Sequence, residues 1–356
     1  MKTTKKGFQE LLEKLKPYDK SHVKIAFEAT GHYSMNLELF LIDKEYSFMK
    51  VNPLLIKEFL KTRSLRRTKT DKADALNIAQ YLMSVPYKPN SSLLYHTYSL
   101  KSLCRTREQL IKERSKFAVL LTNELDKSFP ELKPFFNNMI SATLLFILDK
   151  YKNASHIALM KDYDSIRCIS HGKFTYAKFV QLKELAKNTV GYHDDNTDLL
   201  ISTYVSLYNY FNDKIIPIDK QISTIIKELN PSILSIPGIG EITAASIIAE
   251  YGDVSCFSSS AKMLAFAGLE PSIIESGTLE SNGKMVKHGS GHLRYVLMNA
   301  SLTLLKFNST FYDFYYKKRS EGKCHRIALS HVCKKLVRLI YTLETKHVDF
   351  NPSLLK

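Results

Sequence analysis

Cysteine is scarce in this 356-residue chain. Its five cysteines are widely scattered and show no CxxC spacing (Cys104, Cys168, Cys256, Cys324 and Cys333). That distribution excludes a disulfide framework and the common zinc patterns, and it is typical of a protein of the reducing cytoplasm. Glycine and proline are also few, at 13 and 11 residues, while 44% of the residues are hydrophobic. We therefore expect a folded, helix-rich protein of two or three domains.

Long hydrophobic runs are missing as well. No uncharged apolar run approaches the roughly 18 residues that a membrane-spanning helix needs. The first twenty residues are charged and amphipathic, unlike a signal peptide. The short apolar run at 142–148 is better explained as a buried helix segment. The sequence thus predicts no membrane partner and a cytoplasmic location.

Positive charge is present in excess. The chain has 51 Lys and Arg residues against 35 Asp and Glu, which gives a formal net charge of +16. Such an excess produces a long-range positive field and supplies phosphate contacts that release counterions. A merely basic, well-solvated surface would give the same count, but here basic residues cluster beside the motifs described below. The composition therefore favours a nucleic-acid partner.

The chain is predicted to begin with alternating strands and helices and to continue as helices. The expected elements are helices at 6–16, 33–42 and 54–62, strands at 23–27 and 46–51, and a long amphipathic helix at 99–129. Further helices are expected at 293–307 and 326–342. Strand–helix–strand–helix order is typical of an α/β domain. We expect an α/β domain over 1–90, a helical, coiled-coil arm over 91–230, and a mainly helical domain over 231–356.

Three carboxylates in the first region are candidate metal ligands. Glu28 stands where a predicted strand meets a turn, and Asp71 and Asp74 lie three residues apart at a helix start that Thr70 can cap. Mg²⁺ prefers oxygen ligands and leaves positions open for phosphate oxygens. An acidic pair alone is common on exposed helices. The neighbouring basic residues strengthen the interpretation, because a basic rim suits a phosphate substrate (Arg66, Arg67, Lys69 and Lys72).

A glycine hairpin opens the third region. Pro237-Gly238-Ile239-Gly240 precedes a helix of small residues at 243–250, which is the pattern of a helix-hairpin-helix. Gly238 and Gly240 allow backbone conformations closed to other residues, so that successive N–H groups can face one phosphate. The helix N-terminus adds partial positive charge. An ordinary tight turn between packed helices is the alternative.

Ser276 is the candidate nucleophile, in the turn-prone stretch Ser276-Gly277. A serine attacks phosphorus only where a base or metal assists its deprotonation and cations absorb the developing charge. Four nearby basic residues are available (Lys284, Lys287, His288 and Arg294). His288 either contacts phosphate or caps the loop. Spacing alone does not select Ser276 over Ser272 or Ser281.

The motifs together resemble the DEDD-type insertion-sequence transposases, relatives of a pilin-gene-inverting recombinase. The first half matches in 27–33 (FEATGHY) and 67–75 (RTKTDKADA). The second half matches in 237–240 (PGIG), 268–271 (GLEP) with Ser276-Gly277, and 287–289 (KHG) followed by Leu293-Arg294. The resemblance extends from about residue 6 to about residue 345.

The resemblance implies an RNase H-like (RuvC-like) domain whose acidic tetrad binds Mg²⁺, a coiled-coil arm and a C-terminal transposase domain. Transferred to this chain, Glu28, Asp71 and Asp74 are three acids of the tetrad, and Ser276 is the residue that becomes linked to DNA. The implied partners are double-stranded DNA, a structured guide RNA and further copies of the chain, as a dimer or tetramer.

One departure from the family pattern concerns the tetrad's first aspartate. It lies on an opening strand well before the FEATGHY element, but only 27 residues precede Glu28 here, and neither Asp19 nor Asp43 is at a strand centre. We therefore expect the RuvC-like domain to be N-terminally incomplete, through a misassigned start or a true truncation. The predicted consequences are an exposed apolar strand at 23–27 and poor catalysis.

Two other functions are compatible with these residues. One is a metal-dependent junction nuclease that hydrolyses DNA without a covalent intermediate, which would tolerate the loss of Ser276. The other is a non-catalytic nucleic-acid-binding protein, whose binding would survive both removal of Mg²⁺ and loss of Glu28, Asp71 and Asp74.

Overall fold

The computed structural model describes residues 3–29, 31–61, 70–89, 95–192, 194–270, 274–276, 279–281 and 285–355. Most of these residues are helical, and the strands described form two small two-stranded sheets. The chain divides into two compact units. The first is Met1–Tyr95 with Gly252–Ser258, and the second is His96–Tyr251 with Ser259–Lys356.

The first unit contains a parallel pair of strands. Strand β1 (Ile25–Glu28) pairs with β2 (Phe48–Val51), so that Ile25 faces Phe48 and Glu28 faces Val51. Parallel strands need a crossover. The 3₁₀ turn η2 (Gly31–Ser34) and helix α2 (Met35–Asp43) provide it. All four residues of β1 are partly exposed. The order β1, α2, β2 confirms the predicted strand–helix–strand order.

Apolar side chains of α1 (Lys5–Leu15) and α2 cover this sheet. Leu41, Tyr46 and Phe48 are buried, and the rings of Phe8 and Phe40 stack with centroids 4.8 Å apart. The carboxylate of Glu38, buried on α2, accepts a hydrogen bond from the Ser34 hydroxyl at 2.6 Å and lies 2.8 Å from the Lys50 ammonium. Both contacts are made by Glu38 Oε1, and they offset part of the cost of burying this carboxylate.

Two helices complete the first unit. Helix α3 (Pro53–Lys61) packs against α4 (Asp71–Ser84), and the rings of Phe59 and Tyr81 meet edge to face at 5.4 Å. The Thr70 hydroxyl accepts a hydrogen bond from the Ala73 amide at 3.2 Å, which confirms the predicted helix cap. Helix α4 also packs against β1. The short turns η1 (Lys20–His22) and η4 (Val254–Cys256) belong to this unit.

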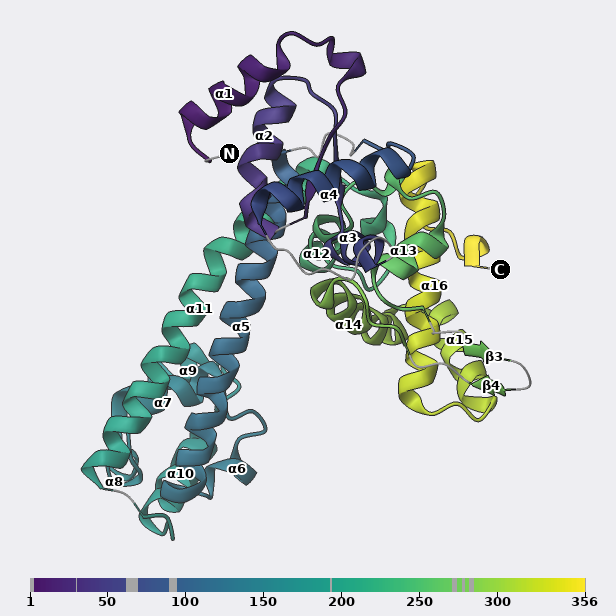
Figure 1. The fold of residues 1–356 in the computed structure, drawn as a ribbon. Helices are drawn as coiled ribbons and strands as arrows, with labels where there is room; N and C mark the ends of the chain where they lie inside the picture. The colour runs from purple at the N-terminus through teal and green to yellow at the C-terminus, as the bar shows by residue number, and fades with distance from the viewer. Residues whose placement is uncertain are drawn as a thin grey trace. The chain divides into compact units, whose positions relative to one another are not determined.

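Two long helices run side by side as an arm (Figure 1). They are α5 (Tyr95–Ser128) and α11 (Asp195–Leu229). Arg107 pairs with Asp219, the Arg114 guanidinium donates to Asn212 at 2.7 Å, and the Phe117 ring stacks on Phe211 at 5.6 Å. As residue numbers rise along α5 they fall along α11, so the helices are antiparallel. A long helical arm was predicted from the apolar spacing at 99–129.

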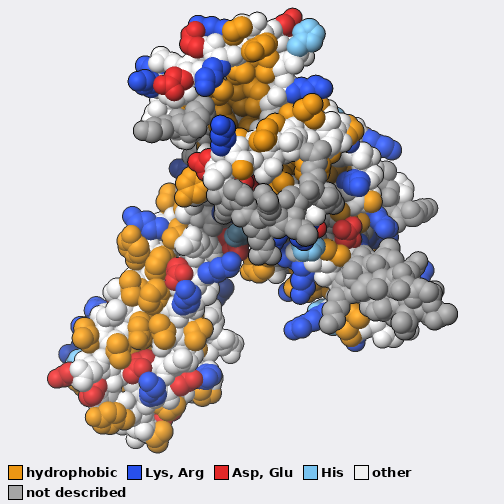
Figure 2. Space-filling model, in the orientation of Figure 1, with side chains coloured by type: hydrophobic (Ala, Val, Ile, Leu, Met, Phe, Trp, Pro, Cys, Tyr) orange, Lys and Arg blue, Asp and Glu red, His pale blue; other side chains and the backbone are white. Residues whose placement is uncertain are grey.

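Short helices fill the end of this arm. They are α6 (Leu132–Phe135), α7 (Ala142–Tyr151), α8 (Ala154–Ala158), α9 (Tyr163–Ile169) and α10 (Tyr176–Lys187). Leu144, Leu145, Ile147 and Leu148 of α7 are buried, which confirms the buried helix predicted at 142–148. On the face in Figure 2, hydrophobic side chains lie open to solvent along the arm among charged ones.

The remainder of the second unit packs around α16 (His325–Lys346), whose Val332, Leu336 and Ile340 are buried. Helices α13 (Ser260–Phe266), α14 (Gly291–Phe307) and α15 (Ser309–Ser320) pack against it, and α12 (Glu241–Tyr251) packs against α14. Strands β3 (Ile274–Ser276) and β4 (Leu279–Ser281) form a hairpin, and η3 (Ser232–Ser235) and η5 (Pro352–Leu355) are 3₁₀ turns. Helices were predicted at 293–307 and 326–342, whereas α15 and the hairpin were not.

The coarse fold prediction, an α/β region followed by helices, agrees with this structure. Its finer parts, the RNase H-like topology, the coiled coil, the helix-hairpin-helix and the three domain boundaries, stay predictions. None of the helices in the described part of the chain combines the length and the apolar character needed to cross a membrane.

Candidate functional site

The three predicted metal ligands lie in the first unit. Glu28 is the last residue of β1 and is half-buried, while Asp71 and Asp74 occupy the first turn of α4. Since α4 packs against β1, the fold places these two elements side by side. Yet among the residues that the structure describes, no group of three or more His, Cys, Asp or Glu side chains lies close enough together to hold a metal ion.

The two aspartates also have a structural role. A negative side chain in the first turn of a helix is stabilised by the unsatisfied N–H groups there, by about 0.3–1 kcal/mol. The positions of Asp71 and Asp74 in α4 are of this kind. The predicted basic rim at Arg66, Arg67 and Lys69 lies outside the described residues. The oxygen donors suit a hard cation such as Mg²⁺ in kind, but these three alone are not gathered into a binding site.

Ser276 lies in the second unit at the end of a hairpin strand. It is the last residue of β3 and pairs with Leu279, the first residue of β4, in antiparallel register. The sequence predicted a turn-prone loop here, whereas the structure has two three-residue strands, β3 and β4. The structure describes the backbone of Ser276, and the hairpin presents that backbone just before its turn. Lys284, predicted beside it, lies outside the described residues.

Two glycines bring together the backbone segments that flank this hairpin. Gly268 has φ +66° and Gly289 has φ +131°. A Cβ added to Gly268 would lie 2.6 Å from the His288 carbonyl oxygen, and one added to Gly289 would lie 2.1 Å from the Phe266 oxygen. The Lys287 amide donates to the Gly268 oxygen at 3.3 Å. The GLEP and KHG motifs therefore meet at the base of the hairpin, where only glycine fits.

Arg294 stabilises this base rather than standing free beside it. Its guanidinium donates to the carbonyl oxygens of Ala267 at 3.1 Å and Lys287 at 3.5 Å. It therefore joins both backbone segments to α14, and its predicted phosphate contact has no support from this geometry. Lys287 and His288 are exposed. Of the basic residues that were predicted beside Ser276 and are described here, these two are exposed and available to a phosphate.

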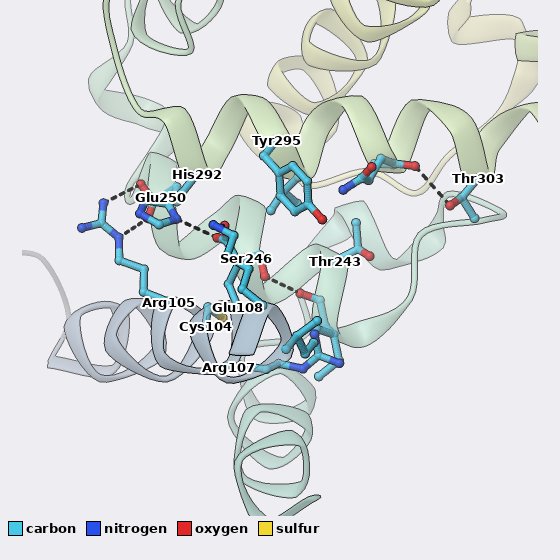
Figure 3. A pocket seen from close by; sticks show the side chains of 16 residues that line it. Cys104, Arg105, Arg107, Glu108, Thr243, Ser246, Glu250, His292, Tyr295 and Thr303 are labelled. Carbon is cyan, nitrogen blue, oxygen red and sulfur yellow. Dashed lines mark hydrogen bonds and ion pairs between the residues drawn. The ribbon is translucent and has the colours of Figure 1, made fainter. Parts of the chain in front are cut away.

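A buried carboxylate links the hairpin base to the arm. Glu250, at the end of α12, is 5% exposed and accepts two hydrogen bonds from Arg105 of α5, at 2.7 and 3.1 Å. It also accepts one from the Ser290 hydroxyl at 2.8 Å. Ser290 caps α14 by accepting from the Leu293 amide at 3.2 Å, directly after the KHG turn. One carboxylate thus connects α5, α12 and the start of α14. Figure 3 shows its pairing with Arg105.

The surroundings of Glu250 keep it ionised. Burial alone would raise the pKa of Glu250, but the hydrogen bonds from Arg105 and Ser290 and the charges of Lys101 and Arg105 outweigh burial, so its pKa lies below the usual value. A carboxyl group whose pKa is lowered by folding stabilises the protein above its unfolded-state pKa of about 4.3. That contribution is lost as the pH falls through the lowered pKa.

Replacing Glu250 with glutamine should loosen the start of α14. We expect the variant Glu250→Gln to lose about 2 kcal/mol of local stability at pH 7, because a neutral amide replaces the buried carboxylate that accepts charge-assisted hydrogen bonds from Arg105. Hydrogen–deuterium exchange measures this loss as faster exchange of the backbone amides of residues 286–294. The difference from the parent protein should shrink as the pH falls below about 4. An equal difference at pH 7 and pH 3 would contradict the assigned role of the ionised carboxylate.

A pocket of about 220 Å³ opens between α5, α12 and α14, beside this carboxylate (Figure 3). Its charged side chains are paired with one another. Glu108 accepts from Lys112 at 2.5 Å and lies 2.6 Å from His292 Nδ1, while Arg105 is bound to Glu250. Buried Cys104 on its wall has a pKa raised to about 11 by burial, so its thiol is protonated and unreactive at neutral pH. Neutralised cations make this pocket a poor site for phosphate.

The predicted phosphate-binding glycines differ from each other. Gly238 has φ +98°, and a Cβ there would press on Phe307 at 3.2 Å. Gly240 is not among the positive-φ glycines and has open space around it, so its backbone does not use the conformational freedom that glycine allows. Glu241 follows in the first turn of α12, bound to Ser223 and Lys227. Its negative charge opposes a phosphate at this helix start.

Comparison with known proteins identifies both halves of the chain. Residues 1–130 match the DEDD transposase family of IS110, and residues 230–316 match the transposase family IS116/IS110/IS902. The chain belongs to the IS110 family of insertion-sequence transposases and recombinases. Family membership implies that it binds DNA and uses a divalent metal.

Relatives of this IS110-family protein include the pilin gene-inverting protein of Moraxella bovis, which is 26% identical over 97% of this chain and 88% of its own length. The homologous protein of Moraxella lacunata is 26% identical over 94% and 84%. An uncharacterized 43.6 kDa protein of IS110 from Streptomyces coelicolor is 22% identical, and that match spans 41% of this chain and 36% of the relative.

Sequence reasoning missed the residues that hold the hairpin base together. Glu250, Arg105 and Ser290 come from three separate parts of the chain, and no motif relates the three residues to one another. The one available signal was an acid at the end of the small-residue helix, at a position where helix periodicity predicts burial.

Proposed function

We propose that this chain is a DNA recombinase of an insertion sequence that cuts and rejoins strands through a covalent link to Ser276. The observation that carries the proposal is the order of matches. One family match holds Glu28, Asp71 and Asp74, and the second holds Ser276 and the glycines that close its hairpin. A chain that has both sets in this order suits strand exchange better than simple hydrolysis.

The reaction proposed for Ser276 replaces one phosphoester bond with another at each step, so the strands can be rejoined without an external energy source. Its Oγ attacks phosphorus while the serine proton passes to a base, the bond from phosphorus to one deoxyribose oxygen breaks, and that oxygen leaves protonated. A hydroxyl of the second strand then attacks the phosphoserine and releases Ser276. The exposed Lys287 and His288 are the described basic residues near Ser276 in the chain that are available to the developing negative charge.

We propose Mg²⁺ as the divalent ion, because its proposed ligands are all carboxylates. When bound, such an ion stabilises charge on the phosphate oxygens. Among the described residues, Glu28, Asp71 and Asp74 do not form a three-ligand cluster, so these three carboxylates would not hold the ion by themselves. The proposed partners are double-stranded DNA, a structured guide RNA, and other copies of the chain as a dimer or tetramer.

Strand exchange between two labelled duplexes, with the element's transcript supplied as guide, tests this function. Product should form with Mg²⁺ and disappear with a chelator. Hydrolysed ends without joined product would instead indicate the junction nuclease. Binding that survives chelation, with neither cleavage nor joining, would indicate a protein that only binds nucleic acid.

A further inference from the structure

Helix α16 has a row of basic residues on its partly exposed side, which we call the basic stripe. Its members follow the spacing i, i+3, i+4 and i+7, which places them on one face of the helix (His331, Lys334, Lys335 and Arg338). From His331 to Arg338 the stripe extends about 10 Å along the helix axis. Val332, Leu336 and Ile340 are buried, so the apolar residues of α16 form a different face.

Lysines of α15 lie against the basic stripe. The two helices pack together, and they lie side by side in Figure 1. The Lys318 ammonium, on α15, and the Lys335 ammonium, on α16, lie 5.6 and 4.5 Å from the centroid of the Phe314 ring. Burial and the nearby charge of Lys317 lower the pKa of Lys335. Cations of both helices therefore share one surface.

The α15–α16 basic surface consists of the basic stripe and three nearby lysines (Lys317, Lys318 and Lys323). Lys318 is paired with Glu321 at 2.8 Å. Within the described part of the chain, none of the remaining lysines of this surface, nor Arg338, has a carboxylate within 4.0 Å. Burial, and then the charges of the surrounding lysines, lower the pKa of His331. Cations that repel one another in this way are stabilised by a bound anion.

The strongly exposed rings of α15 lie on a different side of the helix from this surface. Tyr312 and Tyr316 are 50% and 64% exposed. Each is two residues from Phe314, which corresponds to about 160° around the helix axis. The Phe314 ring itself is half-buried, with two ammonium groups over it. The surface therefore offers positive charge, while its ring is covered.

Positive charge with a covered ring suits the backbone of double-stranded DNA better than it suits unpaired strands or RNA. Proteins bind unpaired strands by combining cations with open rings on which bases stack. Folded RNA is recognised mainly at loops, whose bases stack in the same way. Duplex DNA carries one negative charge per about 1.7 Å of its axis, so about six charges lie opposite the length of the basic stripe.

We propose that the α15–α16 basic surface binds the phosphate backbone of double-stranded DNA, independently of the base sequence. The choice of DNA rests on the proposed function. The surface itself lies beyond the family match that contains Ser276, because that match ends at residue 316. A duplex bound here would be contacted away from Ser276 along the chain, and its phosphates would offset the repulsion among the lysines.

Acetylation of lysine side chains, measured residue by residue by mass spectrometry, tests this surface locally. A chelator is present, so that DNA binds without being cut. Saturating duplex DNA of about 30 base pairs should slow the acetylation of Lys317, Lys334 and Lys335 at least about threefold, because phosphate contacts cover their amines. The controls are three exposed lysines at the end of the arm (Lys161, Lys173 and Lys178). Their acetylation should change by less than about 1.5-fold.

Substitution separates these contacts from other DNA contacts of the protein. Combining Lys317→Gln, Lys334→Gln and Lys335→Gln should reduce the slope of log Kd against log salt concentration by about 2.7, the value for three lost phosphate contacts to a duplex. Replacing the three control lysines with glutamine removes the same charge and should change the slope by less than about 0.5. Circular dichroism checks that both variants are folded.

Protection of the surface lysines by duplex DNA, without protection of the controls, supports the assignment. Absent protection, or equal protection of both sets, overturns it. Equal or stronger protection by a transcript of the element, or by the unpaired DNA strand, would also overturn it, because the occupant would then not be duplex DNA. The same protection is expected in the variant Ser276→Ala, so a failed recombination mechanism and a failed DNA surface give different results.

Discussion

Replacing Ser276 with alanine should abolish the covalent protein–DNA complex and lower strand exchange at least about 10³-fold. Losing an essential nucleophile costs at least this much where no other group replaces it. Electrophoresis of reactions denatured without protease measures the covalent complex, and joined product measures exchange. Binding of the DNA should change little, because alanine removes one hydroxyl from the hairpin strand.

Ser281→Ala is the matched control for this substitution. Ser281 ends β4 and faces Ile274 in the same hairpin, so its replacement perturbs the same strand pair. Exchange by this variant should stay within about twofold of the parent. Loss of activity in both variants would point to hairpin structure rather than to a nucleophile. An active Ser276→Ala protein that still hydrolyses DNA would favour the junction nuclease.

Replacing Asp71 and Asp74 with asparagine should lower metal-dependent strand exchange at least about 10²-fold. A divalent ion held by these carboxylates would stabilise negative charge on the phosphate, and the two amides would hold it less well. The fold should persist, because the loss of two charges from the first turn of α4 costs only about 1 kcal/mol. When strand exchange is measured against Mg²⁺ concentration, the variant should reach half-maximal activity at a higher concentration than the parent. High Mg²⁺ should restore part of the lost activity.

Asp43→Asn is the control for this pair. Asp43 is an exposed acid of the same unit, and it pairs with its neighbour Lys44 at 2.9 Å. Its replacement should leave both exchange and the Mg²⁺ midpoint unchanged. If the Asp71 and Asp74 variants keep full activity with an unchanged midpoint, these acids serve only to stabilise the helix start.

Local signals in the sequence identified the elements of the first unit well. The β-branched and aromatic run at 23–27 predicted a strand, found at Ile25–Glu28, and Thr70 predicted a cap that its hydroxyl does form. Both features depend on neighbouring residues, so a single sequence contains the information. The three-residue strands around Ser276 give too short a pattern for the same reasoning.

Helix α15 was missed for a different reason. Its sequence is rich in aromatic residues, which are weak helix formers, and two of its tyrosines face solvent.

The contact between Arg105 and Glu250 joins residues 145 positions apart. Such a pairing follows from the packing of α5 on α12 and leaves no local trace. The contacts that support the hairpin could therefore be identified only from the structure.

Mapping the residue that carries DNA tests the central claim most directly. Strand exchange is stopped midway, the complex is digested with protease and nuclease, and the peptide that retains a nucleotide is sequenced by mass spectrometry. The account predicts one modified peptide, with the phosphoester on Ser276. A nucleotide attached to a different residue, or efficient exchange with no attached nucleotide at any stage, would contradict it.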